Sequence, residues 1–187
     1  MAGDLGPYLC DLHRSWLALD SRRSWREQEG SLLFFDISGF TPLTERLAKR
    51  GKAGVEQLID TLNGVVAPLV EAAAALGGDT LKFGGDALLV LFTRSGHAER
   101  ACAAAWDMQR AMVPCRRMHT SAGLVSLRAS AGVASGSVQA FLVGDRFREL
   151  VFAGPVTSAV MGLEHDAPAG GVLVGPATAA ALDAGHV

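Results

Sequence analysis

Two segments of the sequence place a carboxylate beside groups that favour phosphate. In the first, FFDISGFT at residues 34–41, a short apolar run ends at Asp36 and a helix is expected to start directly afterwards. The helix dipole and the free backbone amides of this start favour a bound phosphate group. The amides are those of Ser38, Gly39, Phe40 and Thr41. A carboxylate there supplies an oxygen ligand for a hard divalent cation, although Asp36 taken alone could equally cap the following turn.

The second segment, GGDTLKFGGDAL at residues 77–88, has an acid at the tip of an expected hairpin. Asp86 follows a glycine pair that is typical of a tight turn, and a plain hairpin turn would also explain it. Each acid adjoins one of the most apolar runs of the chain, so both are expected at ends of central strands, where a charge needs a counter-charge. No basic residue adjoins Asp36 in sequence. We therefore expect Asp36 and Asp86 to converge and to share metal ions.

The hydrophobic spacing predicts the elements that position these acids. An amphipathic helix is expected over residues 7–28, giving a leading segment 1–29 and a domain 30–187. A helix is expected after Asp36, with Thr41 as its cap, Pro42 at its first position and Glu45 in its first turn. The other expected elements are a strand at 31–37, a helix at 55–76, strands at 79–83 and 86–92, a helix at 98–112, strands at 124–134, 137–143 and 148–153, a helix at 155–163 and a strand at 172–174. This order predicts an α+β fold with helices packed against one face of one antiparallel sheet.

Composition limits the kinds of partner. The chain has 187 residues, the length of one ordinary domain, and 49% of them are hydrophobic, which suggests that a partner, most simply in a dimer, covers part of the surface. A net charge of -2 gives no general attraction for nucleic acid or anionic lipid, so any anion site must be local.

Cysteine usage and the apolar runs bear on location. The three cysteines form neither a disulfide framework nor a zinc ribbon, which favours a reducing, cytoplasmic compartment. No signal peptide or membrane span is expected, since the apolar stretch 65–76 is interrupted by a proline and a glutamate. The chain could be a fragment of a longer protein.

The two motifs, FFDISGFTPLTE at 34–45 and GGDTLKFGGDALLVLF at 77–92, resemble the catalytic domain of class III nucleotidyl cyclases. They are most similar to the first of the tandem domains in soluble, bicarbonate-responsive adenylyl cyclases, and the similarity runs from about residue 31 to about residue 174. The resemblance implies a ferredoxin-like sheet and two Mg²⁺ or Mn²⁺ ions held by Asp36, the carbonyl of Ile37 and Asp86. It also implies conversion of ATP to 3',5'-cyclic AMP and pyrophosphate.

The same resemblance assigns base-reading roles to two residues. Lys82 matches the family's lysine that donates to adenine, where guanylyl cyclases usually carry Glu. By strand alternation alone, Lys82 lies on the face opposite to Leu81 and Phe83, and it could equally be solvent-exposed. Glu149 stands where the family often has a second base-reading Asp or Thr.

The chain departs from the family on the helix after Gly154. The family's Asn and Arg, which orient the ribose and stabilise the transferring phosphate, are replaced by Ser158 and Gly162. In the family each site forms between two domains, so the chain is expected to need a complementary second domain. The alternative is a catalytically silent module that binds nucleotide or a partner cyclase domain. A bicarbonate site at Lys82 is not favoured, because that helix lacks the expected arginine, and a diguanylate cyclase is disfavoured because Glu-Phe is absent after the second Gly-Gly-Asp.

Overall fold

The computed structural model describes residues 9–19, 22–145 and 148–184. The helices are α1 (Asp11–Leu19), α2 (Phe40–Ala48), α3 (Gly51–Ala75), α4 (His97–Ala111), the 3-10 helix η2 (Pro114–Arg117), α5 (Pro155–Asp166) and α6 (Pro176–Ala184). The strands are β1 (Trp25–Ser38), β2 (Asp79–Gly84), β3 (Ala87–Phe92), β4 (Met118–Thr120), β5 (Gly123–Val125), β6 (Arg128–Val143), β7 (Glu149–Ala153) and β8 (Val172–Val174).

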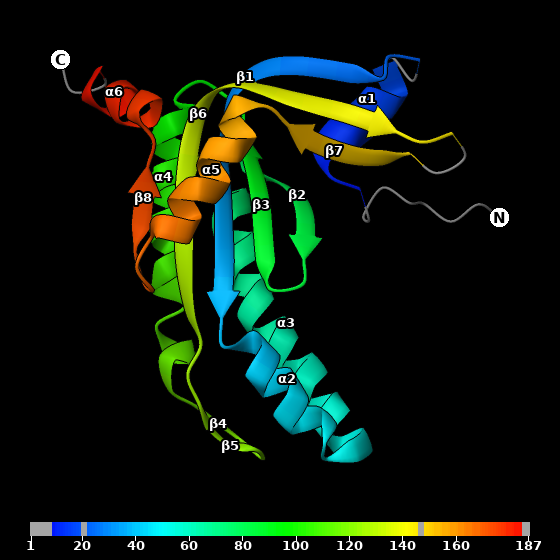
Figure 1. Ribbon diagram of the computed structural model, residues 1–187, viewed down its shortest axis with the longest axis vertical. Coiled ribbons are helices and arrows are strands. Elements are labelled where there is room, and N and C mark those ends of the chain that lie inside the picture. The colour runs from blue at the N-terminus through cyan, green and yellow to red at the C-terminus, as the bar shows by residue number, and fades with distance from the viewer. Residues whose placement is uncertain (1–8, 20–21, 146–147, 185–187) are drawn as a thin grey trace.

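The strands β1 and β6 form the spine of the main sheet. Its order is β2-β3-β1-β6-β7, and the short strand β8 pairs with β6 in parallel beside the start of that strand. All other pairings in this sheet are antiparallel. Figure 1 shows the upper halves of β1 and β6, with β7, bending away from the lower part of the sheet. The chain therefore has the α+β fold with an antiparallel sheet that the sequence predicts.

Each face of the sheet has its own apolar cluster. Side chains of β1 such as Leu33 and Phe35 pack with α3 and α4 on one face. The alternate residue Leu32 packs with Trp16 of α1 and Val160 of α5 on the other. Figure 1 shows α5 in front of β6 and α4 behind it. The sheet thus has helices on both faces, with α3 and α4 as the main layer, whereas the sequence indicated only one helical face.

Close approach of α5 to the sheet depends on one glycine. A Cβ on Gly132 of β6 would lie 2.4 Å from the carbonyl oxygen of Val160. No side chain fits there, so the helix backbone rests directly on the strand. This contact fixes the height of α5 above the end of β1.

Most predicted elements are present, but η2 and β4 were not predicted and three other differences stand out. The predicted helix 7–28 is wrong from residue 22 onward, because Trp25 to Gln28 form the start of β1, paired with Val138 to Phe141. This part of β1 curls over α1, and its exposed and half-exposed residues alternate with period two, which helical spacing cannot accommodate. The predicted strands 124–134 and 137–143 are largely one strand, β6, and the helix α6 was not predicted. Residues 7, 8, 20 and 21 of the predicted helix lie outside the described residues.

The helix α3 is the one described helix that is long and apolar enough to cross a membrane by length and composition. It is 25 residues long, and its buried residues Val65, Leu69 and Ala73 belong to the core formed with α4 and the sheet. A single helix of this kind is weak evidence for a membrane span.

Candidate active site

The sheet register brings the two predicted metal-binding acids to neighbouring strand ends. Asp36 lies near the end of β1, opposite Ala87 of β3, and Asp86 lies in the turn immediately before Ala87. The backbone N–H of Ile37 donates to the carbonyl oxygen of Asp86 across 3.0 Å. Adjacent antiparallel strands are about 4.8 Å apart. Two acids that are distant in sequence therefore share one corner of the sheet.

This corner carries uncompensated negative charge. Burial raises the pKa of Asp36, and the negative charges of Asp86 and Glu164 raise it further. Among the described residues, neither Asp36 nor Asp86 forms an ion pair with a lysine, arginine or histidine. The ionised Asp36 carboxylate is thus destabilised by partial desolvation and by the two nearby negative charges. A bound cation would remove that cost.

The donor set fits a cation that arrives with a nucleotide. No cluster of three or more His, Cys, Asp or Glu side chains suited to a metal ion occurs in the described part of the chain. Mg²⁺ is usually held by one or two carboxylates together with substrate phosphates and waters. Asp36, Asp86 and the main chain at Ile37 offer hard oxygen donors of this kind. The residues present therefore suit Mg²⁺ or Mn²⁺ completed by phosphate oxygens.

The predicted phosphate-binding segment follows Asp36 directly. Gly39 is the N-cap of α2 with φ 95°, and no side chain caps the helix. A Cβ on Gly39 would also lie 2.7 Å from the carbonyl oxygen of Ser126, so glycine is required there. The helix begins at Phe40, whose side chain is buried in the core. Its first amides lack a side-chain partner and remain able to bind an anion.

The predicted capping role of Thr41 is wrong. Thr41 is the second residue of α2, and Pro42 is the third instead of the first. Glu45 lies beyond the first turn. The reason is that Gly39 adopts the left-handed conformation and Phe40 enters the core, so the helix begins earlier than the Thr-Pro pair suggests. Ser38, by contrast, is exposed and donates its hydroxyl to the carbonyl oxygen of Arg128 at 3.3 Å.

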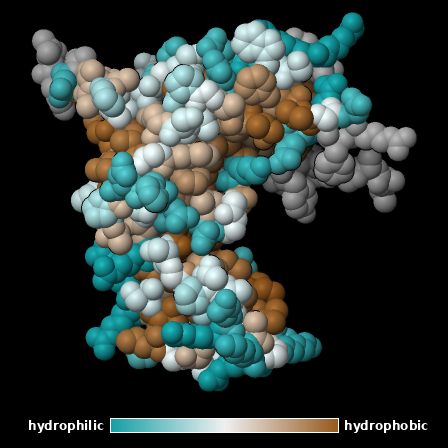
Figure 2. Space-filling model, viewed as in Figure 1, coloured by the Kyte–Doolittle hydropathy of each residue, from teal (hydrophilic) through white to brown (hydrophobic). Residues whose placement is uncertain are grey.

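A hollow beside the helix start connects α2, α3 and the hairpin turn. Its volume is about 350 Å³. It is lined by Phe40, Thr41, Thr44, Glu45, Leu58, Leu62, Gly85 and Asp86. Figure 2 shows the molecule hollowed on its right side, above the part formed by α2 and the first half of α3. Asp86 and Thr41 line this space, whereas Asp36 does not. Sequence reasoning missed the apolar wall of Leu58 and Leu62, which appeared only as part of a helical stripe.

The two predicted base-reading residues meet each other. The Lys82 Nζ donates to Glu149 Oε1 across 2.6 Å, and both side chains are more than half exposed. The hydrogen bond from Lys82, and then its charge, lower the pKa of Glu149. A register shift between Thr80 and Lys82 explains the meeting. Lys82 lies opposite Leu89, whose side chain belongs to the apolar cluster that also contains residues of α1 and β7. The register shift therefore places Lys82 on that face of the sheet.

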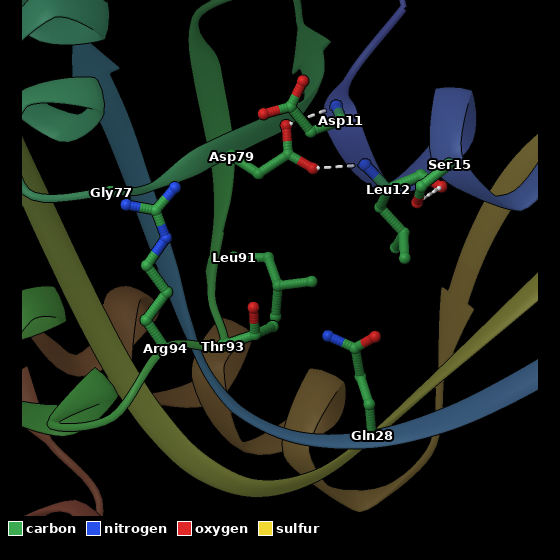
Figure 3. Close-up of a pocket in the computed structure, with 9 residues that line it drawn as sticks. All are labelled: Asp11, Leu12, Ser15, Gln28, Gly77, Asp79, Leu91, Thr93 and Arg94. Carbon is green, nitrogen blue, oxygen red and sulfur yellow. Dashed lines mark hydrogen bonds between the residues drawn. The ribbon is translucent and has the colours of Figure 1, made fainter.

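The other acid of the hairpin motif has a structural role. Asp79, the first residue of β2, accepts hydrogen bonds of 2.8 Å from the backbone N–H groups of Asp11 and Leu12. Figure 3 shows the Asp79 carboxylate directed at the start of α1, with Arg94 extended on the other side of the same pocket. Asp79 therefore caps α1, which sequence reasoning missed because its partners are distant along the chain.

The helix α5 contributes an acid and two small residues. Glu164 Oε1 accepts a hydrogen bond of 2.5 Å from Ser130, which lies opposite Asp36 across β1 and β6. Sequence reasoning also missed Glu164, because nothing in the α5 segment marks it. Ser158 and Gly162 are exposed, and a Cβ added at Gly162 meets no atom within 4 Å. Side chains larger than those present would fit at this surface.

The comparisons with known proteins agree with this geometry. Residues 23–186 match the family model described as the adenylate and guanylate cyclase catalytic domain. A segment of 66 residues is 48% identical to adenylate cyclase type 10 of Homo sapiens and of Rattus norvegicus, covering 34% of this chain and 4% of those proteins.

The structural comparisons show the fold. The guanylyl cyclase Cya2 is similar with a TM-score of 0.70 and 22% identity, over 85% of this chain and 80% of that one. The adenylyl cyclase CyaB from P. aeruginosa is similar with a TM-score of 0.65 and 22% identity, over 87% and 84%. The resemblance seen in the two motifs therefore extends over the sheet and its helices. This chain belongs to the adenylate and guanylate cyclase catalytic domain family.

Proposed function

We propose that the chain is the metal-donating domain of an adenylyl cyclase that converts ATP to 3',5'-cyclic AMP and pyrophosphate by a two-metal mechanism. It acts with a complementary second cyclase domain, in the cytoplasm. The observation that carries the proposal is the uncompensated pair Asp36 and Asp86 beside the uncapped start of α2. An acid pair alone would repel a triphosphate, and helix amides alone would bind one weakly. Together they suit a triphosphate that brings divalent cations.

Each group of the corner has a distinct task in this proposal. Asp36, Asp86 and the Ile37 carbonyl hold the ions, and the amides from Gly39 to Thr41 bind phosphate oxygens. When bound, two such ions neutralise the triphosphate and favour ionisation of the ribose 3'-hydroxyl. The backbone hydrogen bond between Ile37 and Asp86 ties together the two chain segments that carry the acids.

The pair of Lys82 and Glu149 suits adenine, in a site where the partner domain holds the metals. An ammonium donor suits the acceptor nitrogens of adenine, and a carboxylate suits its exocyclic amino group. Their contact of 2.6 Å places a donor and an acceptor side by side. None of the described contacts links this pair to Asp36 or Asp86. This separation is consistent with sites shared between two domains, in which one domain holds the metals and the other reads the base.

The surface of α5 supports the need for a partner. At the positions where the family carries Asn and Arg, this chain has Ser158 and Gly162, neither of which can place a cation on a phosphate. In phosphoryl transfer the loss of such an arginine costs roughly a thousandfold or more in rate. Two copies of this chain would lack these groups at both sites. A second domain that supplies them is therefore part of the proposal.

The test is a measurement of cyclic AMP formation from ATP with Mn²⁺. We expect the isolated chain to be weak or inactive, and a mixture with a cyclase domain that carries the Asn and Arg to be active. In that mixture, Asp36→Asn or Asp86→Asn should abolish turnover, whereas Asp60→Asn on the exposed surface of α3 should leave it unchanged. Robust turnover by the isolated chain would refute the division of labour.

The second candidate is a silent module that binds nucleotide or a partner cyclase domain. Ser158 and Gly162 favour it, and the retained acid pair does not. Nucleotide binding without turnover, even with the second domain supplied, would select this candidate. The two candidates therefore separate in one set of assays.

A further inference from the structure

A buried amide on α4 lacks a hydrogen-bond donor. The Gln109 side chain is 4% exposed, and its Nε2 donates to the carbonyl oxygens of Ala129 and Gly171 at 2.9 and 3.0 Å. Both of these partners are acceptors, so the amide orientation is determined and the Oε1 must be the unpaired atom. This oxygen is buried without a partner. Burial of an unsatisfied acceptor is costly, which indicates that something donates to it.

Two arginines line the cavity beside Gln109. The cavity is about 210 Å³ and is bounded by Gln109, Arg116, Arg128 and the loop that carries Gly170. Among the described residues, no side chain forms an ion pair or hydrogen bond with the guanidinium of Arg116 or Arg128. Two unpaired guanidinium groups around one cavity attract an anion.

The loop between α5 and β8 closes one side of this cavity. The N–H of Gly170 donates to the carbonyl oxygen of Ala129 at 2.7 Å, which ties the loop to β6. The Arg116 guanidinium lies over Gly170, 3.5 Å from where a Cβ would stand. Since Gly170 has a φ of +90°, a larger residue is disfavoured there by the backbone as well. The arginine thus lies beside a loop that is tethered to β6.

We propose that this cavity binds inorganic hydrogen phosphate, with Arg116 and Arg128 on its charged oxygens and its hydroxyl donating to Gln109 Oε1. Hydrogen phosphate offers both acceptor oxygens for the guanidinium groups and a proton for the buried acceptor. A fully deprotonated anion offers only the first. The cavity lies on the α4 side of the sheet, since Ala129 belongs to the core with α3 and α4, and its residues are not those of the acid pair. The proposal is therefore independent of the cyclase function.

The experiment is a titration of the ¹⁵N-labelled full chain at neutral pH and constant ionic strength, without divalent cation or nucleotide. The signals followed are the Gln109 side-chain amide and the Gly170 backbone amide. Sodium phosphate should shift both in a saturable manner. Sulfate, which is tetrahedral and doubly charged but carries no proton, should bind about tenfold more weakly. Methyl phosphate, largely a dianion without a hydroxyl at this pH, should behave like sulfate and so distinguish free phosphate from a phosphate ester.

Variants test the arginines without touching the core. Arg116→Gln and Arg128→Gln should each weaken phosphate binding about tenfold. The matched control is Arg117→Gln, since Arg117 is the exposed neighbour that does not line the cavity. Equal binding of the three anions, no saturable shift with phosphate, or an unchanged affinity in both arginine variants would overturn the proposal. The absence of a saturable shift would leave a buried water as the partner of Gln109.

Discussion

Replacement of Asp36 by asparagine should raise stability and remove metal binding together. Asparagine keeps the size and polarity of the side chain but removes the charge that faces Asp86 and Glu164. A purely structural aspartate behaves in the opposite way, because its loss removes hydrogen bonds and lowers stability. The sign of the stability change therefore tests whether the corner is arranged for a cation.

The size of the effect follows from the strand spacing. Two unit charges about 6 Å apart repel by about 3 kcal/mol at an effective dielectric constant of about 20 and by about 0.7 kcal/mol at about 80. Asp36 is only partly buried, which favours the lower end. We expect Asp36→Asn to raise the free energy of unfolding by about 1 kcal/mol. For a chain of this length the melting temperature should rise by about 2–4 °C.

The assay is thermal unfolding with and without Mn²⁺ and a non-hydrolysable ATP analogue. Without ligand, Asp36→Asn should melt above the wild type. With saturating ligand, the wild type should gain more than the variant, because only a site that binds the native state raises stability by mass action. The control Asp60→Asn should change neither value.

The pH dependence has a definite sign. The pKa of Asp36 is raised on folding, so the folded state binds its proton more tightly than the unfolded state does. Below the pKa that Asp36 has in the unfolded state, the side chain is protonated in both states and costs no stability. The free energy of unfolding then falls as pH rises towards the raised folded-state pKa, and above that pH the loss stays constant. The stability advantage of Asp36→Asn should therefore shrink towards zero in acid.

A lower melting temperature for Asp36→Asn at neutral pH would refute this reasoning. So would an equal rise of the two proteins with Mn²⁺ and the ATP analogue. The first result would mean that Asp36 is stabilised by its surroundings, and the second that the ions bind elsewhere.

Other expectations follow from the same structure. The double substitution Ser158→Asn and Gly162→Arg should give the isolated chain cyclase activity at least about a hundredfold above its starting level, measured as cyclic AMP, because both positions are exposed and a Cβ added at Gly162 meets no atom within 4 Å. In that double variant, whose paired copies would supply both the metals and the base-reading residues, Lys82→Ala should raise the KM for ATP about tenfold while leaving the melting temperature unchanged, since its pair with Glu149 is exposed. Asp79→Ala should lower stability by about 1 kcal/mol in urea unfolding and speed proteolysis within α1, because it removes both hydrogen bonds to the helix start.

The sequence predicted the elements around the acid pair well, and physical reasons explain where it did not. The strand ending at Asp36, the glycine turn before Asp86 and the helix start after Gly39 depend on local chemistry. Glu164 and the capping by Asp79 depend on chain segments that meet only in the folded protein. The same holds for the curl that turns Trp25 to Gln28 into strand. Pairing with the end of β6 there overrides a local pattern that favours helix.

The face of the sheet on which Lys82 lies is the clearest example of a feature that depends on pairing with another strand. Simple alternation left exposure and base reading equally open, because alternation assumes a regular ladder. The register shift after Thr80 breaks that assumption. Only the pairing partners, Val90 for Thr80 and Leu89 for Lys82, reveal the change of face.

This extra residue also decides which residues of the hairpin share a face of the sheet. A regular ladder through the same residues would place Lys82 opposite Leu88 and send it to the other face, away from Glu149. With the shift, Lys82 stands opposite Leu89 and Asp79 opposite Leu91. Two charged residues three positions apart, which regular alternation would separate, therefore lie on one face, where Asp79 binds the start of α1 and Lys82 meets Glu149.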